Sequence, residues 1–157
     1  MDRDSQKFDE HDHKLLKILQ VDASQPVEAV AAQIGLSRNA AWRRIRRLEE
    51  IGAIRARVAL LDAEVLGVGL SVFIAVRTGH HDAKTAEAFS RAVARHPEIT
   101  GVYRTSGDLD YLLHARVRDV RDYDELYKSL IAEVELKDIS ASFVMEEIKE
   151  TTEIPVG

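Results

Sequence analysis

The stretch Ser37 to Glu50, SRNAAWRRIRRLEE, constrains the fold most, because it is typical both of a packed helix and of a cationic surface. Ser37 is a good N-cap residue, straight-chain helix formers fill the interior, and Gly52 provides a natural stop. At about 100° per residue, one face is apolar and consists of Ala41, Ile45 and Leu48. The opposite face is polar and basic and consists of Asn39, Arg43, Arg46 and Arg47. We therefore predict a helix whose apolar face, the back, packs against the protein and whose basic face, the front, is exposed.

The residues just before this stretch complete a helix-turn-helix pattern. Residues 27–34 (VEAVAAQI) predict a short helix, and Pro26 suits its start because the missing amide hydrogen costs nothing there. Gly35-Leu36 predicts a tight turn that lets the two helices cross steeply, so that the second can enter a major groove about 12 Å wide. The alternative is that the arginine face is merely solvated, as charge runs usually are. The turn, the small residues at the helix crossing and the basic front agree, which favours DNA binding.

Charge distribution supports the same interpretation. The net charge is −5, but the basic residues of residues 1–61 outnumber the acidic ones by two, whereas residues 62–157 carry an excess of seven acidic residues. Within residues 38–57 there are seven basic and two acidic residues. A local basic face on an acidic protein is typical of a DNA-reading module joined to a second module.

Length and composition exclude several classes of protein. The 157 residues suffice for one medium or two small domains, and 45% hydrophobic residues can bury a core. Because there is no cysteine, disulfides, thiol catalysis and cysteine-ligated metals are excluded. No run approaches the roughly 18 apolar residues of a membrane span, and the N-terminus is too charged for a signal peptide. We expect no membrane partner and a cytoplasmic location.

The remainder of the first half predicts a support helix and a wing. Residues 9–21 carry a helical apolar stripe formed by Leu15, Leu16, Ile18 and Leu19. Residues 53–61 (AIRARVALL) switch to an alternation of period two, which predicts a strand or wing whose Arg55 and Arg57 are available to phosphates. The two glycines of residues 62–69 mark a domain boundary, so we predict domains at 1–61 and 62–157.

The second half alternates strands and helices. Strands are predicted at 70–78, 99–105, 109–118 and 139–148, and helices at 84–96 and 122–134. This β-α-β-β-α-β order is the ferredoxin-like arrangement, in which both helices cover one face of an antiparallel sheet. The bare face would carry apolar side chains that a symmetric partner covers most simply, namely Phe73, Ala75 and Leu112.

The run Ser106 to Tyr111 (SGDLDY) is the most suggestive cluster outside the helix-turn-helix. Backbone amides beside Gly107 and the carboxylate of Asp108 suit the two charged ends of an amino acid, but Gly-Asp is also common turn chemistry, and the spacing alone favours a plain hairpin turn. Nothing near the carboxylates supplies a catalytic nucleophile or a third metal ligand with recognisable spacing. Walker A and Rossmann glycine motifs are absent too. We expect no enzyme, no metal and no cofactor.

Taken together, these motifs resemble the leucine-responsive/asparagine-regulator (Lrp/AsnC, feast/famine) family of transcription factors. In the first half the resemblance rests on Asp9-His11-Asp12, Leu15 to Leu19 with Gln20 and Asp22, Ile34 to Ser37, Arg44 to Glu49, Gly52 and Ile54. In the second half it rests on Leu66-Gly67, Ser106 to Leu113 and Val144 to Lys149. It implies an α+β protein: an N-terminal winged helix-turn-helix joined by a β-linker to a C-terminal ferredoxin-like βαββαβ sensing domain.

The resemblance also implies a function and partners. The chain would be a sequence-specific transcriptional regulator, a homodimer assembling to tetramers or octamers on a pseudo-palindromic double-stranded operator. An amino-acid effector would bind between dimers at Thr105, Ser106, Gly107, Asp108 and Asp110, with Ser142 and Phe143 of the last strand. The expected DNA-contacting residues are Ser37, Arg38, Asn39, Trp42, Arg43, Arg46, Arg47, Arg55 and Arg57. The alternative is a metabolite-binding regulatory protein without specific DNA readout, which leaves the helix-turn-helix unexplained.

Two departures from the family pattern affect these expectations. The usual Pro-Gly before the last strand is here Glu135-Leu136, so that loop is expected to differ in shape. Trp42 is unusual for its position, and it either stacks on the support helix or touches the DNA backbone. The tail at 151–155 and the His80-His81 segment are more similar to the cysteine-sensing than to the leucine-sensing branch.

Overall fold

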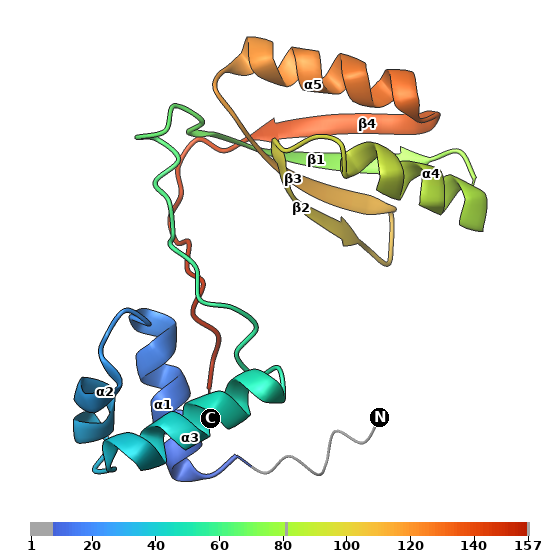
Figure 1. Cartoon of the computed structure of the whole chain (residues 1–157). Coiled ribbons are helices and arrows are strands. Elements are labelled where there is room, and N and C mark those ends of the chain that lie inside the picture. The colour runs from blue at the N-terminus through green and yellow to red at the C-terminus, as the bar shows by residue number, and fades with distance from the viewer. Residues whose placement is uncertain (1–7, 81, 157) are drawn as a thin grey trace. The chain divides into compact units, whose positions relative to one another are not determined.

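The computed structural model describes residues 8–80 and 82–156, so His81 lies outside the described residues. The chain forms two compact units (Figure 1). One contains the residues up to Ala59 together with those from Lys149 onward, and the other runs from Leu60 to Ile148. The C-terminal segment therefore belongs with the first unit, whereas the predicted domains placed it with the second.

The first unit is the predicted three-helix arrangement. It contains α1 (Glu10–Val21), α2 (Val27–Gln33) and α3 (Arg38–Glu50). Asp9 caps α1 through a reciprocal capping box with Asp12, and the Ser37 hydroxyl accepts a hydrogen bond from the Ala40 amide at the start of α3. The apolar faces meet in one core, formed by Leu15, Leu19, Val30, Ile34, Ile45 and Leu48. Burial of the α3 back face holds its basic front toward solvent.

The prediction of a strand or wing at residues 53–61 is wrong for this chain. The segment forms no strand, and its apolar side chains after Ile54 are exposed, with Val58 at 75% and Leu60 at 72%. A strand needs a neighbour to satisfy its amide and carbonyl groups. No strand of the described residues pairs with this segment, so the alternating pattern lacks the partner that would make it a β-linker.

The second unit confirms the ferredoxin-like order. The strands are β1 (Leu70–Thr78), β2 (Ile99–Arg104), β3 (Tyr111–Val117) and β4 (Leu136–Phe143), and the helices are α4 (Ala83–Val93) and α5 (Val120–Glu133). The sheet is antiparallel in the order β2-β3-β1-β4, and Figure 1 shows both helices on one of its faces. The core between helices and sheet includes Val72, Ile74, Phe89, Leu113 and Leu130. No helix among the described residues is long and apolar enough to span a membrane.

The last strand lies earlier than predicted. Residues 139–148 were expected, but β4 begins at Leu136 and ends at Phe143. Its neighbour β1 begins at Leu70, and Phe143 pairs with Val72, so the residues beyond 144 extend past the end of the sheet. The alternating sequence pattern continues in these residues, but no neighbouring strand is there for them to pair with. The start is earlier because Leu136, which replaces the family glycine, pairs with Thr78 across a register shift.

The sheet face opposite the helices carries the predicted apolar side chains. Phe73 is 41% exposed and stacks on His114 with ring centroids 4.7 Å apart. Ala75 and Leu112 lie next to each other in the β1–β3 register and are partly buried. The His114 ring lies between the hydroxyls of Ser71, 2.8 Å from Nε2, and Thr100, 3.2 Å from Nδ1. This face combines an aromatic pair with ordered polar groups.

Candidate DNA interface and effector loop

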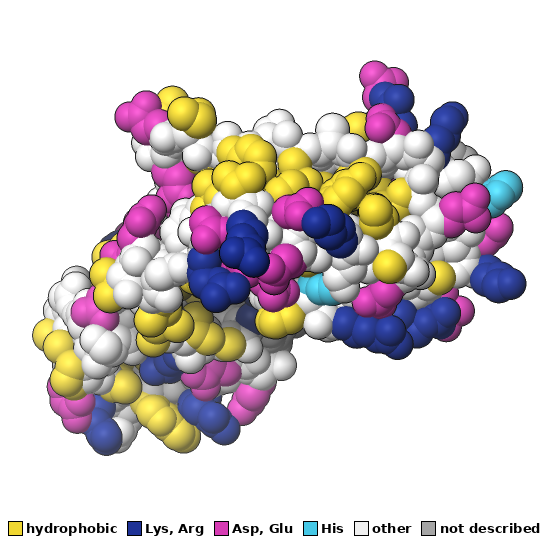
Figure 2. Space-filling model, turned by 90° about the horizontal axis from the view of Figure 1, so that it is seen from above, with side chains coloured by type: hydrophobic (Ala, Val, Ile, Leu, Met, Phe, Trp, Pro, Cys, Tyr) yellow, Lys and Arg dark blue, Asp and Glu magenta, His cyan; other side chains and the backbone are white. Residues whose placement is uncertain are grey.

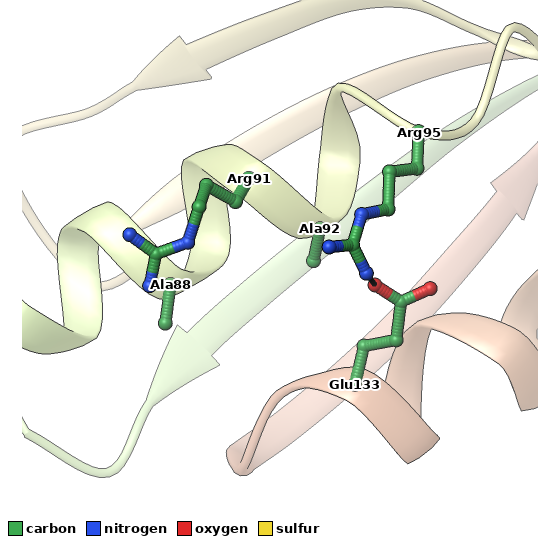
Figure 3. A pocket seen from close by; sticks show the side chains of 5 residues that line it. All are labelled: Ala88, Arg91, Ala92, Arg95 and Glu133. Carbon is green, nitrogen blue, oxygen red and sulfur yellow. Dashed lines mark hydrogen bonds and ion pairs between the residues drawn. The ribbon is translucent and has the colours of Figure 1, made fainter.

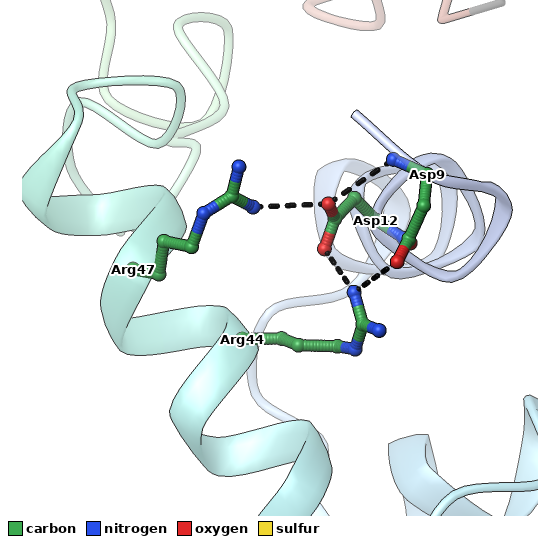
Figure 4. A network of polar contacts seen from close by, with 4 residues as sticks. All are labelled: Asp9, Asp12, Arg44 and Arg47. Atoms are coloured by element: carbon green, nitrogen blue, oxygen red, sulfur yellow. Dashed lines mark hydrogen bonds and ion pairs between the residues drawn. The ribbon is translucent and has the colours of Figure 1, made fainter. Parts of the chain in front are cut away.

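A buried carboxylate fixes α3 against α1. Asp12 is 1% exposed and accepts hydrogen bonds from Arg44 Nη1 at 2.9 Å and Arg47 Nη1 at 3.0 Å (Figure 4). Arg44 Nη1 also lies 2.7 Å from Asp9 Oδ2. The backbone amide of Asp12 and the Arg44 side chain both lower the pKa of Asp9, the amide more strongly. Two arginines of α3 therefore brace the support helix, and Arg47, predicted on the DNA-facing front, points its guanidinium toward α1.

Three further predicted DNA-contacting arginines form surface ion pairs. Arg38 at the start of α3 pairs with Glu28 of α2. Glu49 receives Arg57 Nη2 at 2.8 Å and lies 3.6 Å from Arg46 Nη1. These groups are exposed enough for such pairs to be weak, so a phosphate can displace the carboxylate at small cost.

The exposed front retains unpaired cationic groups. Among the described residues, no ion pair or hydrogen bond engages the guanidinium of Arg43 or Arg55, and both side chains are exposed, as is Asn39. Trp42 is 51% exposed and has no ring contact with another aromatic side chain of the described residues. In this structure Trp42 therefore does not stack on an aromatic side chain of the support helix, which leaves its indole open to a partner.

The predicted effector loop is a well-ordered turn between β2 and β3. Gly107 has φ +127°, a conformation that a side chain rarely adopts. Thr105 donates its hydroxyl to the Leu109 carbonyl at 2.6 Å, and the Asp108 carbonyl accepts from Arg77 Nε at 2.6 Å. Asp110 Oδ2 accepts from both the amide and the hydroxyl of Thr78, at 2.7 and 3.0 Å. Asp110 thus holds the end of β1 in place, a role that the sequence did not reveal.

The structure does not bring the two halves of the predicted effector site together within one chain. Ser142 pairs with Phe73 on β1, and the Phe143 ring packs against Tyr123 at 5.2 Å in the core. The loop joins the far end of β1 through Asp110 and lies on the β3 side, so two strand spacings of about 4.8 Å each separate it from β4. An effector site that uses both the loop residues and the β4 residues Ser142 and Phe143 therefore needs a second chain.

Sequence reasoning missed Asp12 and Arg44 as a positioning pair. A signal was available, because Asp9 and Asp12 on one helix and Arg44 and Arg47 on the other share the same three-residue spacing. The helical wheel could not assign these arginines, since which side of α3 meets α1 depends on how the helices cross.

Comparison with known proteins agrees with this architecture. Residues 8–49 match the model of the AsnC-type helix-turn-helix domain, and residues 71–154 match the Lrp/AsnC ligand binding domain. The chain belongs to the Lrp/AsnC family. This confirms the resemblance drawn from the sequence and, within the predicted fold class, the N-terminal helix-turn-helix and the C-terminal α+β domain. The family consists of transcriptional regulators.

Similar Lrp/AsnC proteins match the chain along almost its whole length. The DNA-binding transcriptional activator DecR of Escherichia coli is 40% identical over 95% of this chain and 99% of its own length. An AsnC family regulator from Agrobacterium tumefaciens has a TM-score of 0.91 and 45% identity, covering 94% of this chain and 97% of that one. A transcriptional regulator from Neisseria meningitidis, solved as an L-Met complex, has a TM-score of 0.91 and 31% identity, covering 95% and 97%.

Proposed function

We propose that this protein is a sequence-specific DNA-binding transcriptional regulator whose DNA binding or assembly is modulated by an amino acid. The observation that carries the proposal is the exposed, unpaired Arg43 next to Asn39 on α3, a helix that Asp12 anchors from behind. The similar DecR protein is a DNA-binding activator, and the similar Neisseria regulator binds L-Met, which supports both halves of the proposal. A regulator of this kind acts in the cytoplasm, where DNA is accessible.

In this proposal the exposed residues of α3 and of the segments next to it contact DNA in two ways. Arg43 and Asn39 read base edges, because a guanidinium suits guanine and a carboxamide suits adenine. Arg38, Arg55 and Arg57 hold phosphates together with Ser37, Trp42, Arg46 and the exposed part of Arg47. Two such helices in a homodimer meet two half-sites of a pseudo-palindromic operator about one helical turn or a multiple apart. Assembly to tetramers or octamers lengthens the bound DNA.

We propose that the amino-acid effector binds at the loop between β2 and β3, where two dimers meet. Backbone amides at Gly107 and the hydroxyl of Ser106 suit an α-carboxylate, and Asp108 suits an α-ammonium group. The Thr105 hydroxyl already donates to the Leu109 carbonyl, so Thr105 contributes by holding the loop. Since Asp110 Oδ2 is already engaged by Thr78, Asp110 contributes chiefly by shaping the loop. Ser142 and Phe143 would reach the ligand from a neighbouring chain.

The test compares Arg43→Ala with Arg55→Ala in operator and random-sequence gel shifts at several salt concentrations. A base contact discriminates by roughly 1–3 kcal/mol, so Arg43→Ala should lose operator affinity while affinity for random DNA falls little. A phosphate contact contributes on every sequence, so Arg55→Ala should weaken both equally and flatten the salt dependence. An equal loss on both DNAs for Arg43→Ala contradicts the base-reading role. Wild-type protein without operator preference would favour the alternative, a metabolite-binding protein without specific DNA readout.

A further inference from the structure

Among the described residues, two hollows of the second unit differ in charge. One, of about 180 Å³, lies between α4 and α5 and is lined by Ala88, Arg91, Ala92, Arg95 and Glu133 (Figure 3). Its arginines already have carboxylates, Glu87 for Arg91 at 2.8 Å and Glu133 for Arg95 at 3.1 Å. Figure 2 likewise shows basic side chains next to acidic ones over the face that it draws. This hollow offers no uncompensated charge to a ligand.

The other hollow, of about 310 Å³, lies at the end of the sheet where β1 begins. It is lined by Glu64, Gly67, Gly69, Leu70, Arg118 and Val144. Arg118 follows the end of β3 and Val144 follows the end of β4, whereas the effector loop lies at the opposite end of the sheet. We propose that this hollow is a second ligand site, distinct from the effector loop, for a small aliphatic amino acid in its zwitterionic form.

The acidic side of the hollow is held in place by a compact turn. The Val65 amide donates to Asp62 Oδ1 at 3.1 Å, the Val68 amide donates to the Ala63 carbonyl at 2.9 Å, and Gly67 adopts φ +74°. A Cβ on Gly69 would lie 2.5 Å from Glu64 Cδ, so only glycine lets the Glu64 carboxylate lie against the backbone there. Among the described residues this carboxylate has no hydrogen bond or ion pair, which leaves it available to an ammonium group.

The basic side of the hollow is oriented by an ion pair. Arg118 donates from Nε to Asp122 Oδ2 at 3.1 Å and from Nη2 to Oδ1 at 2.6 Å. This two-point contact fixes the guanidinium plane, and Arg118 lowers the pKa of Asp122 to about 2. The Nη1 group has no partner among the described residues and can donate to a carboxylate. The lining of the hollow therefore contains both a held guanidinium and an available carboxylate.

The ligand class follows from these groups. Glu64 supplies acceptors for an α-ammonium and Arg118 supplies donors for an α-carboxylate, while Leu70 and Val144 offer apolar contacts to an aliphatic side chain. The hollow is also large enough to hold an amino acid of the size of leucine. Because Asp122 neutralises much of the Arg118 charge, the ammonium should contribute more to binding than the carboxylate.

A ligand in this hollow would contact both segments that connect the two units of the chain. Glu64, Gly67 and Gly69 belong to the segment that connects the first unit to β1, and Val144 begins the segment that leaves β4 for the first unit. A bound amino acid would contact both connecting segments and restrict them together. An effect on DNA binding rests on the proposed function, whereas binding to the hollow does not.

The test is isothermal titration calorimetry of L-leucine into the full-length protein and four variants. Asp108→Ala disables the proposed effector loop, and in that background we expect L-leucine binding to remain. Adding Glu64→Gln or Gly69→Ala should raise the Kd at least tenfold, because the first removes the carboxylate charge and the second displaces it. Glu87→Gln, on the exposed surface of α4 outside the hollow, is the matched control and should leave the Kd unchanged.

Two further probes separate the outcomes. Isopentylamine and 4-methylpentanoate, which each lack one charged group of leucine, should bind the Asp108→Ala protein at least tenfold more weakly than leucine. The Gly67 and Gly69 amide resonances of this protein should shift when L-leucine is added. Loss of all L-leucine binding in Asp108→Ala overturns the second site and leaves the effector loop supported. Equal Kd values for Glu64→Gln and Glu87→Gln also overturn it.

Discussion

At the scale of single residues, Asp12 decides how the DNA-binding helix is presented. Asp12 is 1% exposed, and its carboxylate is compensated by Arg44 and Arg47, whose side chains are 30% and 42% exposed. A buried charge that loses its hydrogen bonds is costly, so this site tolerates little change. The same contacts turn Arg44 and Arg47 toward α1 and leave Arg43 exposed to solvent, so similar residues of one helix have different surroundings.

We predict that Asp12→Asn lowers the free energy of unfolding of the protein by about 2–3 kcal/mol, because two guanidinium groups lose their carboxylate. Urea denaturation followed by circular dichroism measures the change. Glu10→Gln on the same helix is the control, since Glu10 pairs with Lys14 at the surface, and it should leave the free energy of unfolding almost unchanged. Similar costs for the two variants would contradict the bracing role of Asp12.

A second prediction at this scale concerns pH. Since Arg118 holds the pKa of Asp122 at about 2, below its ordinary 3.8, the folded protein binds this proton less readily than the unfolded chain. The resulting stability is present above pH 3.8 and is lost as the pH falls from 3.8 toward 2. Urea midpoints measured between pH 5 and 2.5 should therefore fall less steeply for Asp122→Asn than for the wild type. Parallel slopes would show that the pair adds nothing to acid stability.

At the scale of elements, most helices and strands follow from the sequence, because hydrophobic periodicity is local. The Leu70–Thr78 strand was predicted with its observed bounds, and α3 differs by one residue at its start. Predictions failed where an element depends on a distant neighbour. Residues 53–61 alternate as a strand does but have no partner in the chain, and residues 145–148 extend beyond the start of β1. The effector residues could be proposed from their chemistry, but their separation across β1 could not.

The end of α3 gives a prediction about DNA affinity. Glu49 receives Arg57 and lies near Arg46, so it holds two cations that the proposed function assigns to phosphates. Glu49→Gln should release both and strengthen binding to operator and random DNA alike, by roughly 0.5–1 kcal/mol, with a steeper salt dependence. Filter binding at several salt concentrations measures both. Glu50→Gln, which changes the same charge at an exposed position next in sequence, is the control for a general charge effect.

At the scale of the whole molecule, the bare sheet face and the unpaired segment at 53–61 both indicate a second copy of the chain. Phe73 is 41% exposed at the centre of a face that also carries Ala75 and Leu112, and exposed apolar side chains of this kind favour association. One α3 helix also reads too little DNA for tight, specific binding, whereas two-fold pairing supplies the second helix. The separation of the effector loop from Ser142 points the same way, because a shared site needs another chain.

We therefore predict that the wild-type protein is at least a dimer at micromolar concentration and that Phe73→Lys shifts it toward monomer. A lysine charge buried between two sheet faces lacks a partner, so association should weaken by several kcal/mol. Ile131→Lys is a matched control, since Ile131 is 42% exposed but lies on α5 rather than on the bare face. Analytical ultracentrifugation measures assembly, and circular dichroism verifies that both variants keep their helices. A monomeric wild type, or equal dissociation of the two variants, would show that this face is not where the copies meet.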